Sequence, residues 1–507
     1  MLLRQLARAQ PAASSSKLLH TSSTLLAPLP TTIASALKES TVASSTEPIT
    51  INGWIRSCRR QKNISFAVIN DGSSVRGIQA VLSKGLDEGL TVGCSASLKG
   101  RFVDSPGKGQ AKEFKVEQVE LLGKSDAETY PIPNTKQGVP ATVLRRNAHL
   151  RPRATAAAAM LRVRSKMALA VAEHFDSEEF VRVEAPLITS SDCEGAGEVF
   201  RVESGPTAPP PPPPSAVSPT SSSPTSPPPP PPTPRYLTVS SQLHLEAISS
   251  SLNRVYTFSP AFRAEKSDTA RHLQEFWMLE AEVGFLDAEN PTALEQVMDV
   301  AERVIRSVTR RLAQTDDIAY FKTQSPALAA QLDGLSSPQP YARLTYTEAV
   351  RVLEDYVSTN PSAFVHPVKW GLSLQTEHEK WLAEQHVGGP VFVTDYPTPM
   401  KPFYMLPNPG CAEGRETTAC FDLLVPRLGE LIGGSLREHD EGALREAMRR
   451  HGIKEEDYEW YLELRRYGTT RHGGFGLGWE RLVACLTGLE NVRDCIAFPR
   501  ATEGSRF

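Results

Sequence analysis

The segment that most constrains the fold is residues 49–123, where five short strand-like runs follow one another. Apolar residues recur along the last run at Phe114, Val116 and Val119, and turn residues such as Asn70-Asp71-Gly72 separate earlier runs. The five runs are Ile49–Cys58, Ser65–Asp71, Gly77–Leu82, Cys94–Val103 and Glu113–Leu122. So many strands in about 75 residues predict a small, closed, five-stranded β-barrel.

A barrel of this size is typical of the OB fold, which often binds single-stranded nucleic acid. A five-stranded barrel with no such role is the alternative. The formal net charge of the 507 residues is -3, which neither supports nor excludes nucleic acid because a local basic face is enough to meet phosphates. We assign residues 46–123 to this barrel domain.

The rest of the chain predicts a hinge and one large α+β domain. Residues 124–150 contain three prolines and read as the hinge. From Arg151 the pattern becomes helical through Phe180, and apolar and polar segments then alternate to the C-terminus. Residues 204–234 interrupt this domain with almost nothing but proline, serine and threonine. Such a composition cannot build a core, so we expect a solvated, disordered insertion inside a domain that spans 151–507.

The first 45 residues differ from the rest. They carry Arg4, Arg8 and Lys17 but no acid before Glu39, and serine and threonine are frequent. This composition is typical of a mitochondrial transit peptide, and a disordered tail is the alternative. It predicts a protein of the mitochondrial matrix. No apolar run approaches the ~20 residues of a membrane span, and seven widely spaced cysteines argue against a disulfide framework.

Three separated segments carry residues suited to phosphate and magnesium chemistry. Each segment alone could have a purely structural role, as a salt-bridged strand, an acidic turn or a glycine-rich strand end. All three in this order, after a barrel domain, are much stronger evidence of a functional site. The segments are Phe262-Arg263-Ala264-Glu265 with Arg271-His272-Leu273-Gln274-Glu275-Phe276; Cys420-Phe421-Asp422 with Gly429-Glu430-Leu431-Ile432-Gly433-Gly434-Ser435-Leu436-Arg437; and Gly473-Gly474-Phe475-Gly476-Leu477-Gly478-Trp479-Glu480-Arg481-Leu482.

Together these segments resemble motifs 2 and 3 of the class II aminoacyl-tRNA synthetases, subgroup b. Residues 181–186 resemble motif 1, which builds the dimer interface in that family. Within the subgroup the resemblance is to asparaginyl-tRNA synthetases, most visibly over residues 190–200, 237–248 and 394–405. It implies a catalytic domain with an antiparallel sheet flanked by helices, a homodimer, and the ligation of L-asparagine to tRNA(Asn) through an asparaginyl-adenylate, with ATP and Mg²⁺.

The resemblance also implies roles for individual residues around ATP. Arg263 and Arg481 would be the catalytic residues, binding the α-phosphate and the triphosphate tail, because the arginine fork gives charge-assisted bonds to phosphate. Phe276 would stack under adenine and Glu265 would take its amino group, while His272 would meet the terminal phosphates. Asp422 and Glu430 would hold Mg²⁺, a cation that prefers oxygen ligands.

The amino-acid site implied by the resemblance contains Glu194, Gln242, Glu280 and Arg437. An amide offers one acceptor and one donor, so Arg437 can donate to its oxygen and Glu280 can accept from its nitrogen. The alternative is that Glu280 only braces Arg437. Aspartyl-tRNA synthetases place a lysine three positions after the glutamine that matches Gln242, whereas this chain has Leu245. An aspartyl enzyme is therefore the disfavoured alternative, and a non-catalytic RNA-binding paralogue is a second one.

Three barrel residues match the subgroup's anticodon-reading pattern. Phe66 would stack on a splayed anticodon base, Gln79 would hydrogen-bond a base edge, and Arg56 would join them. A core aromatic is the alternative for Phe66. The partners expected are thus tRNA(Asn), L-asparagine and a second copy of the chain, with no membrane.

Overall fold

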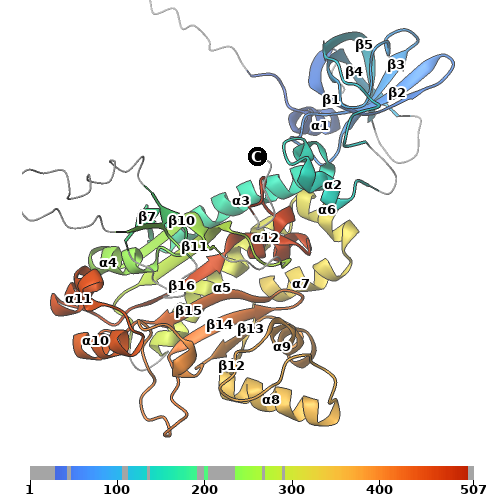
Figure 1. Ribbon diagram of the computed structural model, residues 1–507. Coiled ribbons are helices and arrows are strands. Elements are labelled where there is room, and N and C mark those ends of the chain that lie inside the picture. The colour runs from blue at the N-terminus through green and yellow to red at the C-terminus, as the bar shows by residue number, and fades with distance from the viewer. Residues whose placement is uncertain are drawn as a thin grey trace, which may run out of the picture.

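A computed structural model describes residues 29–42, 47–105, 112–133, 138–190, 199–203, 234–264, 269–287 and 292–500. Figure 1 shows a small barrel domain beside a larger domain built on one broad sheet. Residues 1–28 and 204–233, which hold most of the expected leader and the proline-rich insertion, lie outside the described residues. Within the described residues, no helix combines the length and the apolar composition that crossing a membrane would require.

The N-terminal domain is a closed barrel with strand order β1-β2-β3-β5-β4. The closed five-stranded barrel predicted from the sequence is confirmed, and every strand ends within a few residues of its expected bounds. Its inward side chains, which include Ile51, Ile55, Ala80 and Phe114, are almost fully buried. The strands are β1 Ile49–Arg60, β2 Ile64–Asn70, β3 Ile78–Ser83, β4 Ser95–Asp104 and β5 Lys112–Gly123.

A helix precedes the barrel where the sequence predicted only leader. Helix α1, Ile33–Val42, buries Ile33 and Ala36 in the barrel core, each 1% exposed. The β2–β3 turn holds the start of this helix, because the Ile33 and Ala34 amides donate to Asp71 Oδ2 and Ser73 Oγ, both at 2.9 Å. The expected boundary at residue 45 therefore included a helix that belongs to the barrel. The spacing of Ile33, Ala36 and Leu37 on one helical face was the signal for it.

Removing α1 is expected to destabilise the barrel. A chain that lacks residues 1–45 loses the buried Ile33 side chain and should be less stable by about 2–5 kcal/mol, because the loss resembles a large core truncation. A chain that lacks only residues 1–28 is the matched control and should unfold like the full chain. Thermal or urea unfolding of the three proteins measures the difference, and equal stability of the two shortened chains would contradict the packing of α1.

The larger domain is built on an eight-stranded sheet with order β12-β13-β14-β15-β16-β11-β10-β6. Its six central strands pair antiparallel, while β12 and β6 pair parallel at the two edges. The strands are β6 Val181–Arg182, β10 Arg254–Phe262, β11 Glu275–Val283, β12 Ala342–Thr345, β13 Val391–Thr394, β14 Cys420–Val425, β15 Gly429–Leu436 and β16 Gly473–Gly478. The expected antiparallel sheet flanked by helices is confirmed.

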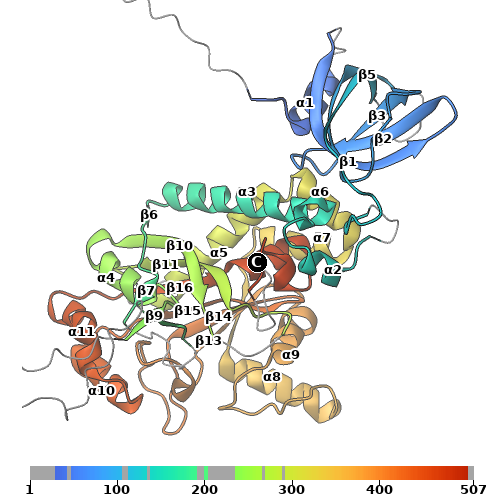
Figure 2. The same cartoon turned by 45° about the horizontal axis from the view of Figure 1, so that its top comes forward.

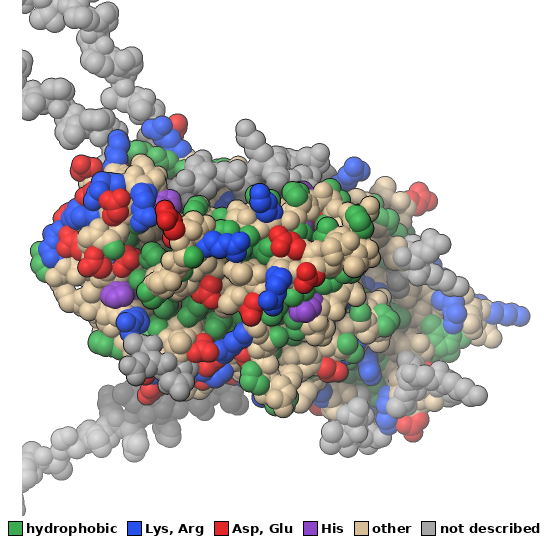
Figure 3. Space-filling model, turned by 90° about the horizontal axis from the view of Figure 1, so that it is seen from below, with side chains coloured by type: hydrophobic (Ala, Val, Ile, Leu, Met, Phe, Trp, Pro, Cys, Tyr) green, Lys and Arg blue, Asp and Glu red, His purple; other side chains and the backbone are tan. Residues whose placement is uncertain are grey.

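Helices pack on this sheet and give it one buried face. The main apolar core lies between the sheet and a group of helices that Figure 2 shows beside it. This group is α3 Thr155–Ser177, α5 Ala293–Leu312, α6 Asp316–Gln324, α7 Ala327–Ser336 and α12 Trp479–Thr487. Outside it lie α4 Gln242–Leu252, α8 Tyr346–Thr359, α9 Thr376–Trp381, α10 Glu441–Arg450 and α11 Glu459–Arg466. Over α10 and α11 in Figure 3, basic and acidic side chains are interspersed.

The expected hinge contains a short helix, α2 Ala141–Arg146, which is tied to the C-terminal end of the chain. Arg145 forms a bidentate ion pair with Asp494, in which Nε donates to Oδ1 at 2.9 Å and Nη2 donates to Oδ2 at 2.6 Å. Arg151, 3% exposed, donates to the carbonyl oxygens of Arg493 and Ala497, both at 3.0 Å. These contacts anchor the segment that joins the barrel to the larger domain.

A small three-stranded sheet closes the base of the proline-rich insertion. Strand β9, Arg235–Leu237, pairs antiparallel with both β7, Ile188–Thr189, and β8, Arg201–Val202. Val202 pairs directly with Arg235, so the two strands that flank the insertion lie side by side.

Candidate active site

The pattern of alternation along β11 and β16 creates a polar face on the central sheet. On β11, Leu279 and Ala281 point into the apolar core, so Glu280 and Glu282 point to the opposite face. On β16, Gly474, Gly476 and Gly478 fall on this opposite face. A Cβ at Gly474 would lie 2.1 Å from Glu282 Oε2, so only glycine leaves room for that carboxylate. Two adjoining cavities occupy this face.

The first cavity, of about 120 Å³, is lined by the residues expected to bind ATP. Arg263 follows the end of β10, and its guanidinium lies 5.4 Å from the centre of the Phe276 ring on β11. Arg481 enters from the first turn of α12. Five of the residues that were predicted to bind ATP line this cavity: Arg263, His272, Phe276, Glu430 and Arg481. Glu265 lies outside the described residues.

Two guanidiniums meet at Glu430 on the wall of this cavity. Arg481 Nη1 donates to Glu430 Oε2 at 3.0 Å and to its carbonyl oxygen at 3.2 Å. Arg271 Nη2 donates to the same carbonyl at 3.3 Å. Burial acts to raise the pKa of Glu430, but the charge and hydrogen bond of Arg481, together with the charges of Lys401 and Arg271, lower that pKa. Arg271 was not among the predicted site residues, although its segment was singled out.

Glu379 from α9 adds a carboxylate behind these arginines. Its Oε2 lies 3.5 Å from Arg271 Nη1 and accepts from the Glu430 amide at 3.1 Å. Burial raises the pKa of Glu379 to about 7, and the neighbouring Glu430 adds to the effect. Glu379 could not be predicted as a site residue, because it lies outside the three motif segments in the sequence.

Asp422 and Glu430 lie on either side of a space at Gly433 in which a cation could be held. A Cβ at Gly433 would lie 3.4 Å from Asp422 Oδ1 and 3.7 Å from Glu430 Oε1, so the glycine leaves open the space between two carboxylate oxygens. Lys401 Nζ approaches the other oxygen of Asp422 at 3.4 Å. Burial raises the pKa of Asp422; Lys401 opposes this shift, and the neighbouring Glu430 adds to it. Carboxylate oxygens arranged in this way fit Mg²⁺ shared with phosphate groups.

The second cavity, of about 410 Å³, contains the described residues of the predicted amino-acid site. Gln242, Glu280 and Arg437 line it, together with Asp422 and Leu245. Arg263 lines both cavities, so one guanidinium stands where the two meet. Glu194, the fourth predicted amino-acid ligand, lies outside the described residues.

Arg437 is braced by Glu282 and not by Glu280. Its Nη2 donates to Glu282 Oε2 at 2.9 Å and its Nε to Glu282 Oε1 at 3.2 Å, while Nη1 donates to Ser435 Oγ at 2.6 Å. The alternative in which Glu280 braces Arg437 is therefore wrong. Arg437 and Glu282 are 2% and 1% exposed, so this pair forms a rigid wall of the cavity. The sequence signal for Glu282 was its spacing of two residues from Glu280 on a strand.

Glu280 is held by the start of α4. Its Oε2 accepts from the Ser241 amide at 2.9 Å, and Ser240 Oγ donates to Oε1. Burial raises the pKa of Glu280, and these hydrogen bonds oppose that shift. The carboxylate thus faces the cavity from a fixed position.

The barrel places two of the three predicted anticodon residues on one surface. Phe66 on β2 pairs with Val81 and Gln79 on β3 pairs with Val68, so both side chains share the outer face. Phe66 is not a core aromatic, because its neighbours Ser65 and Ala67 point inward and are buried, whereas Phe66 is only partly buried. Arg56 differs: it sits at an irregularity of β1 and lines a cavity at the junction with the larger domain, beside Arg153.

Known proteins resemble this chain over almost its whole length. A family model described as tRNA synthetases class II (D, K and N) matches residues 141–502, and one described as an OB-fold nucleic acid binding domain matches residues 49–122. The asparagine–tRNA ligase of Oleidesulfovibrio alaskensis is 41% identical over 91% of this chain and 96% of its own length. That of Thermosynechococcus vestitus is 41% identical over 90% and 96%. The structure of asparaginyl-tRNA synthetase from Pyrococcus horikoshii complexed with asparaginyl-adenylate superposes with a TM-score of 0.76 at 29% identity, covering 90% of this chain and 95% of that one.

Proposed function

The chain belongs to the class II tRNA synthetases of the D, K and N group and, within it, to the asparagine–tRNA ligases, and from this premise we propose how its site works. It activates L-asparagine with ATP to an asparaginyl-adenylate and then transfers the asparaginyl group to tRNA(Asn). The observation that carries the mechanism is the position of Arg263, which lines both the ATP cavity and the amino-acid cavity.

In the first step the carboxylate of asparagine attacks the α-phosphorus of ATP and pyrophosphate leaves. Negative charge develops on the α-phosphate at the point where the two cavities meet. A guanidinium fixed there donates charge-assisted hydrogen bonds to the developing charge. Arg481 and Arg271 carry the positive charge further along the ATP cavity. Catalysis therefore rests on positioning and electrostatic stabilisation and needs no protein nucleophile.

Asp422 and Glu430 are the residues that would hold Mg²⁺. The ion, when bound with ATP, supplies positive charge that offsets the phosphates. The open space at Gly433 between the two carboxylate oxygens supports this assignment. Lys401 neutralises part of the acidic pair from the other side of Asp422.

The substrate is assigned to asparagine and not aspartate from the charges in the amino-acid cavity. Arg437 donates to the side-chain oxygen and Glu280 accepts from the side-chain nitrogen. Leu245 adds an apolar surface where an aspartyl enzyme would add a cation. ATP–pyrophosphate exchange with purified protein tests the assignment: we expect exchange with asparagine and almost none with aspartate. Equal exchange with both amino acids would contradict the substrate, and exchange with neither would contradict the activity.

Phe66 supplies the stacking platform for an anticodon base on the barrel. The Arg59 guanidinium lies 5.8 Å from its ring centre and adds positive charge beside it. We expect Phe66→Ala to lower kcat/KM for tRNA(Asn) by about tenfold to a hundredfold, since stacking contributes roughly 1–3 kcal/mol per base. Pyrophosphate exchange without tRNA should stay unchanged and serves as the control. An unchanged kcat/KM for tRNA would remove Phe66 from the interface.

The protein acts as a homodimer in the mitochondrial matrix. Exposed apolar side chains gather around the segment that resembles motif 1, with Val181 43%, Leu187 37% and Ile188 50% exposed, and β6 is the last strand of its sheet. A single-chain mass in light scattering at micromolar concentration would contradict the dimer. The acid-free composition of the first 38 residues supports mitochondrial import, and a cytosolic signal from residues 1–28 fused to a fluorescent reporter would contradict it.

A further inference from the structure

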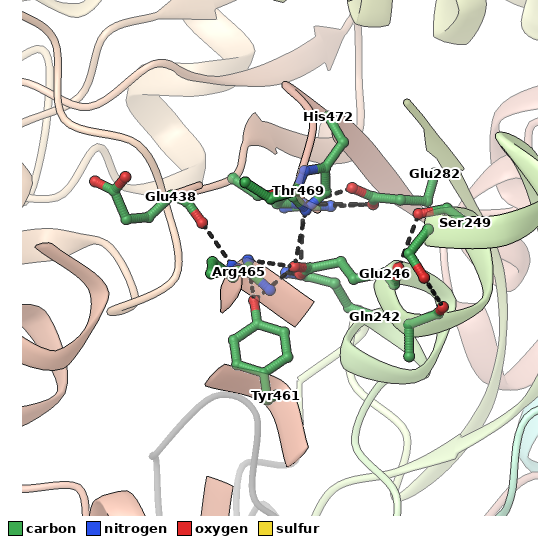
Figure 4. A network of polar contacts seen from close by, with 12 residues as sticks. Gln242, Glu246, Ser249, Glu282, Glu438, Tyr461, Arg465, Thr469 and His472 are labelled. Carbon is green, nitrogen blue, oxygen red and sulfur yellow. Dashed lines mark hydrogen bonds and ion pairs between the residues drawn. The ribbon is translucent and has the colours of Figure 1, made fainter. Parts of the chain in front are cut away.

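A buried network of charges lies beneath the amino-acid cavity, where α4, α11 and the residues before β16 meet (Figure 4). Its centre is Glu246 on α4, which is 2% exposed. Tyr461, Arg465 and His472 surround it and are at most 6% exposed. None of these four residues lines the ATP cavity or was predicted to contact asparagine, yet Tyr461, Arg465 and His472 together enclose the Glu246 carboxylate beneath the site.

One oxygen of Glu246 anchors the network to the scaffold. Oε2 accepts from Tyr461 Oη at 2.6 Å and from Arg465 Nη2 at 2.8 Å, and His472 Nε2 lies 3.2 Å away. Burial alone would raise the pKa of Glu246, but Arg465, His472 and Arg437 hold it well below its usual range. The carboxylate is therefore charged and fixed in place.

The other oxygen lies next to two residues that line the amino-acid cavity, Gln242 and Arg437. Oε1 accepts from Gln242 Nε2 at 3.1 Å and lies 3.8 Å from Arg437 Nε. Gln242 precedes Glu246 by one turn of α4, so the two side chains share a helix face. Because an ionised carboxylate can only accept, the Gln242 amide must turn its NH₂ group toward Glu246. Its carbonyl oxygen is left for the cavity that Gln242 lines.

We propose that Glu246 is a positioning residue that selects for the α-ammonium group of the substrate. It holds the Gln242 carbonyl toward the cavity as an acceptor for that ammonium. With the amide reversed, Gln242 would present donors to a cation. This inference rests on the proposed function and names the group that makes the site require an amino acid.

The test compares asparagine with succinamic acid, which is asparagine without its α-amino group. In Glu246→Gln the side chain keeps its size but no longer fixes the Gln242 amide. We expect the KM for asparagine in pyrophosphate exchange to rise by about tenfold to a hundredfold, as for the loss of a hydrogen bond to a charged group. The inhibition constant of succinamic acid and the KM for ATP should change by less than about threefold. Ser249→Ala, which removes only a contact to the Glu246 carbonyl oxygen, is the control and should match wild type.

Two further variants separate positioning from a purely structural role. Gln242→Ala leaves the charges intact and should weaken the binding of asparagine but not the binding of succinamic acid. The double variant Gln242→Ala/Glu246→Gln should bind asparagine only slightly more weakly than Gln242→Ala, because both changes remove the same interaction. Should Glu246→Gln fail to fold, Gln242→Ala and Glu246→Asp carry the test. The proposal would be overturned if the binding of asparagine and of succinamic acid weakened equally, or if the binding of asparagine did not weaken. Absence of asparagine-dependent exchange in the wild type would instead overturn the proposed function.

Discussion

Arg263→Ala should lower asparagine-dependent pyrophosphate exchange by about a thousandfold or more, because one donor to a developing negative charge typically contributes 10²–10³. Arg263 contributes more than such a donor, since it lines the cavities of both substrates. The protein should stay folded, because the side chain is only half-buried and lies on the wall of the site. Steady-state exchange and thermal unfolding of the same preparation measure the two effects separately.

Arg263→Lys is the matched variant for this prediction. It keeps the positive charge but replaces the planar fork with a point charge. We expect an intermediate loss of roughly a hundredfold, which would assign part of the effect to the geometry of the guanidinium. Exchange near the wild-type rate in Arg263→Ala would remove this residue from the reacting centre.

Leu245→Lys should reduce the preference for asparagine over aspartate by a hundredfold or more. Leu245 is 1% exposed and lines the same cavity as Glu280 and Arg437. In the wild type, bound aspartate would place a second carboxylate near Glu280 in a desolvated cavity, which can cost several kcal/mol. An added ammonium would compensate that charge. The measurement is kcat/KM for each amino acid in pyrophosphate exchange.

Leu245→Met is the control for that change, because methionine has a similar volume and no charge. It should leave the preference for asparagine within about threefold of wild type. If Leu245→Lys retains the full preference while folding normally, selection against aspartate arises elsewhere in the site.

The parts of the fold that the sequence predicted are those in which local pattern and composition agree. Side chains of the barrel strands alternate with a period of two, and the strands end at recognisable turns, so the positions of the strands could be predicted. The residues that line the ATP cavity fell in three segments whose order was specific enough to bring Arg263, Phe276 and Arg481 together. Helix α1 was not predicted, because the acid-free composition of this region indicated a transit peptide and the apolar face of the helix is short.

The remaining site residues could not be predicted because they act through tertiary contacts. Glu280 and Glu282 lie two residues apart on one face of β11 and have the same charge, and only the strand register shows which of them reaches Arg437. Glu379 and Tyr461 come from helices far along the chain from the residues they contact. A carboxylate on a helix is usually a solvated surface group, so nothing in the sequence marked Glu246 as buried.

The pairing of β8 with β9 has a consequence for engineering this protein. Because Val202 lies directly opposite Arg235, the ends of whatever chain joins them are held together by the sheet itself. A folded guest domain whose termini lie close together could then replace residues 204–233 without pulling on α4, which begins a few residues later at Gln242. The position offers an internal attachment point for a fluorescent or affinity module that leaves both chain termini unaltered.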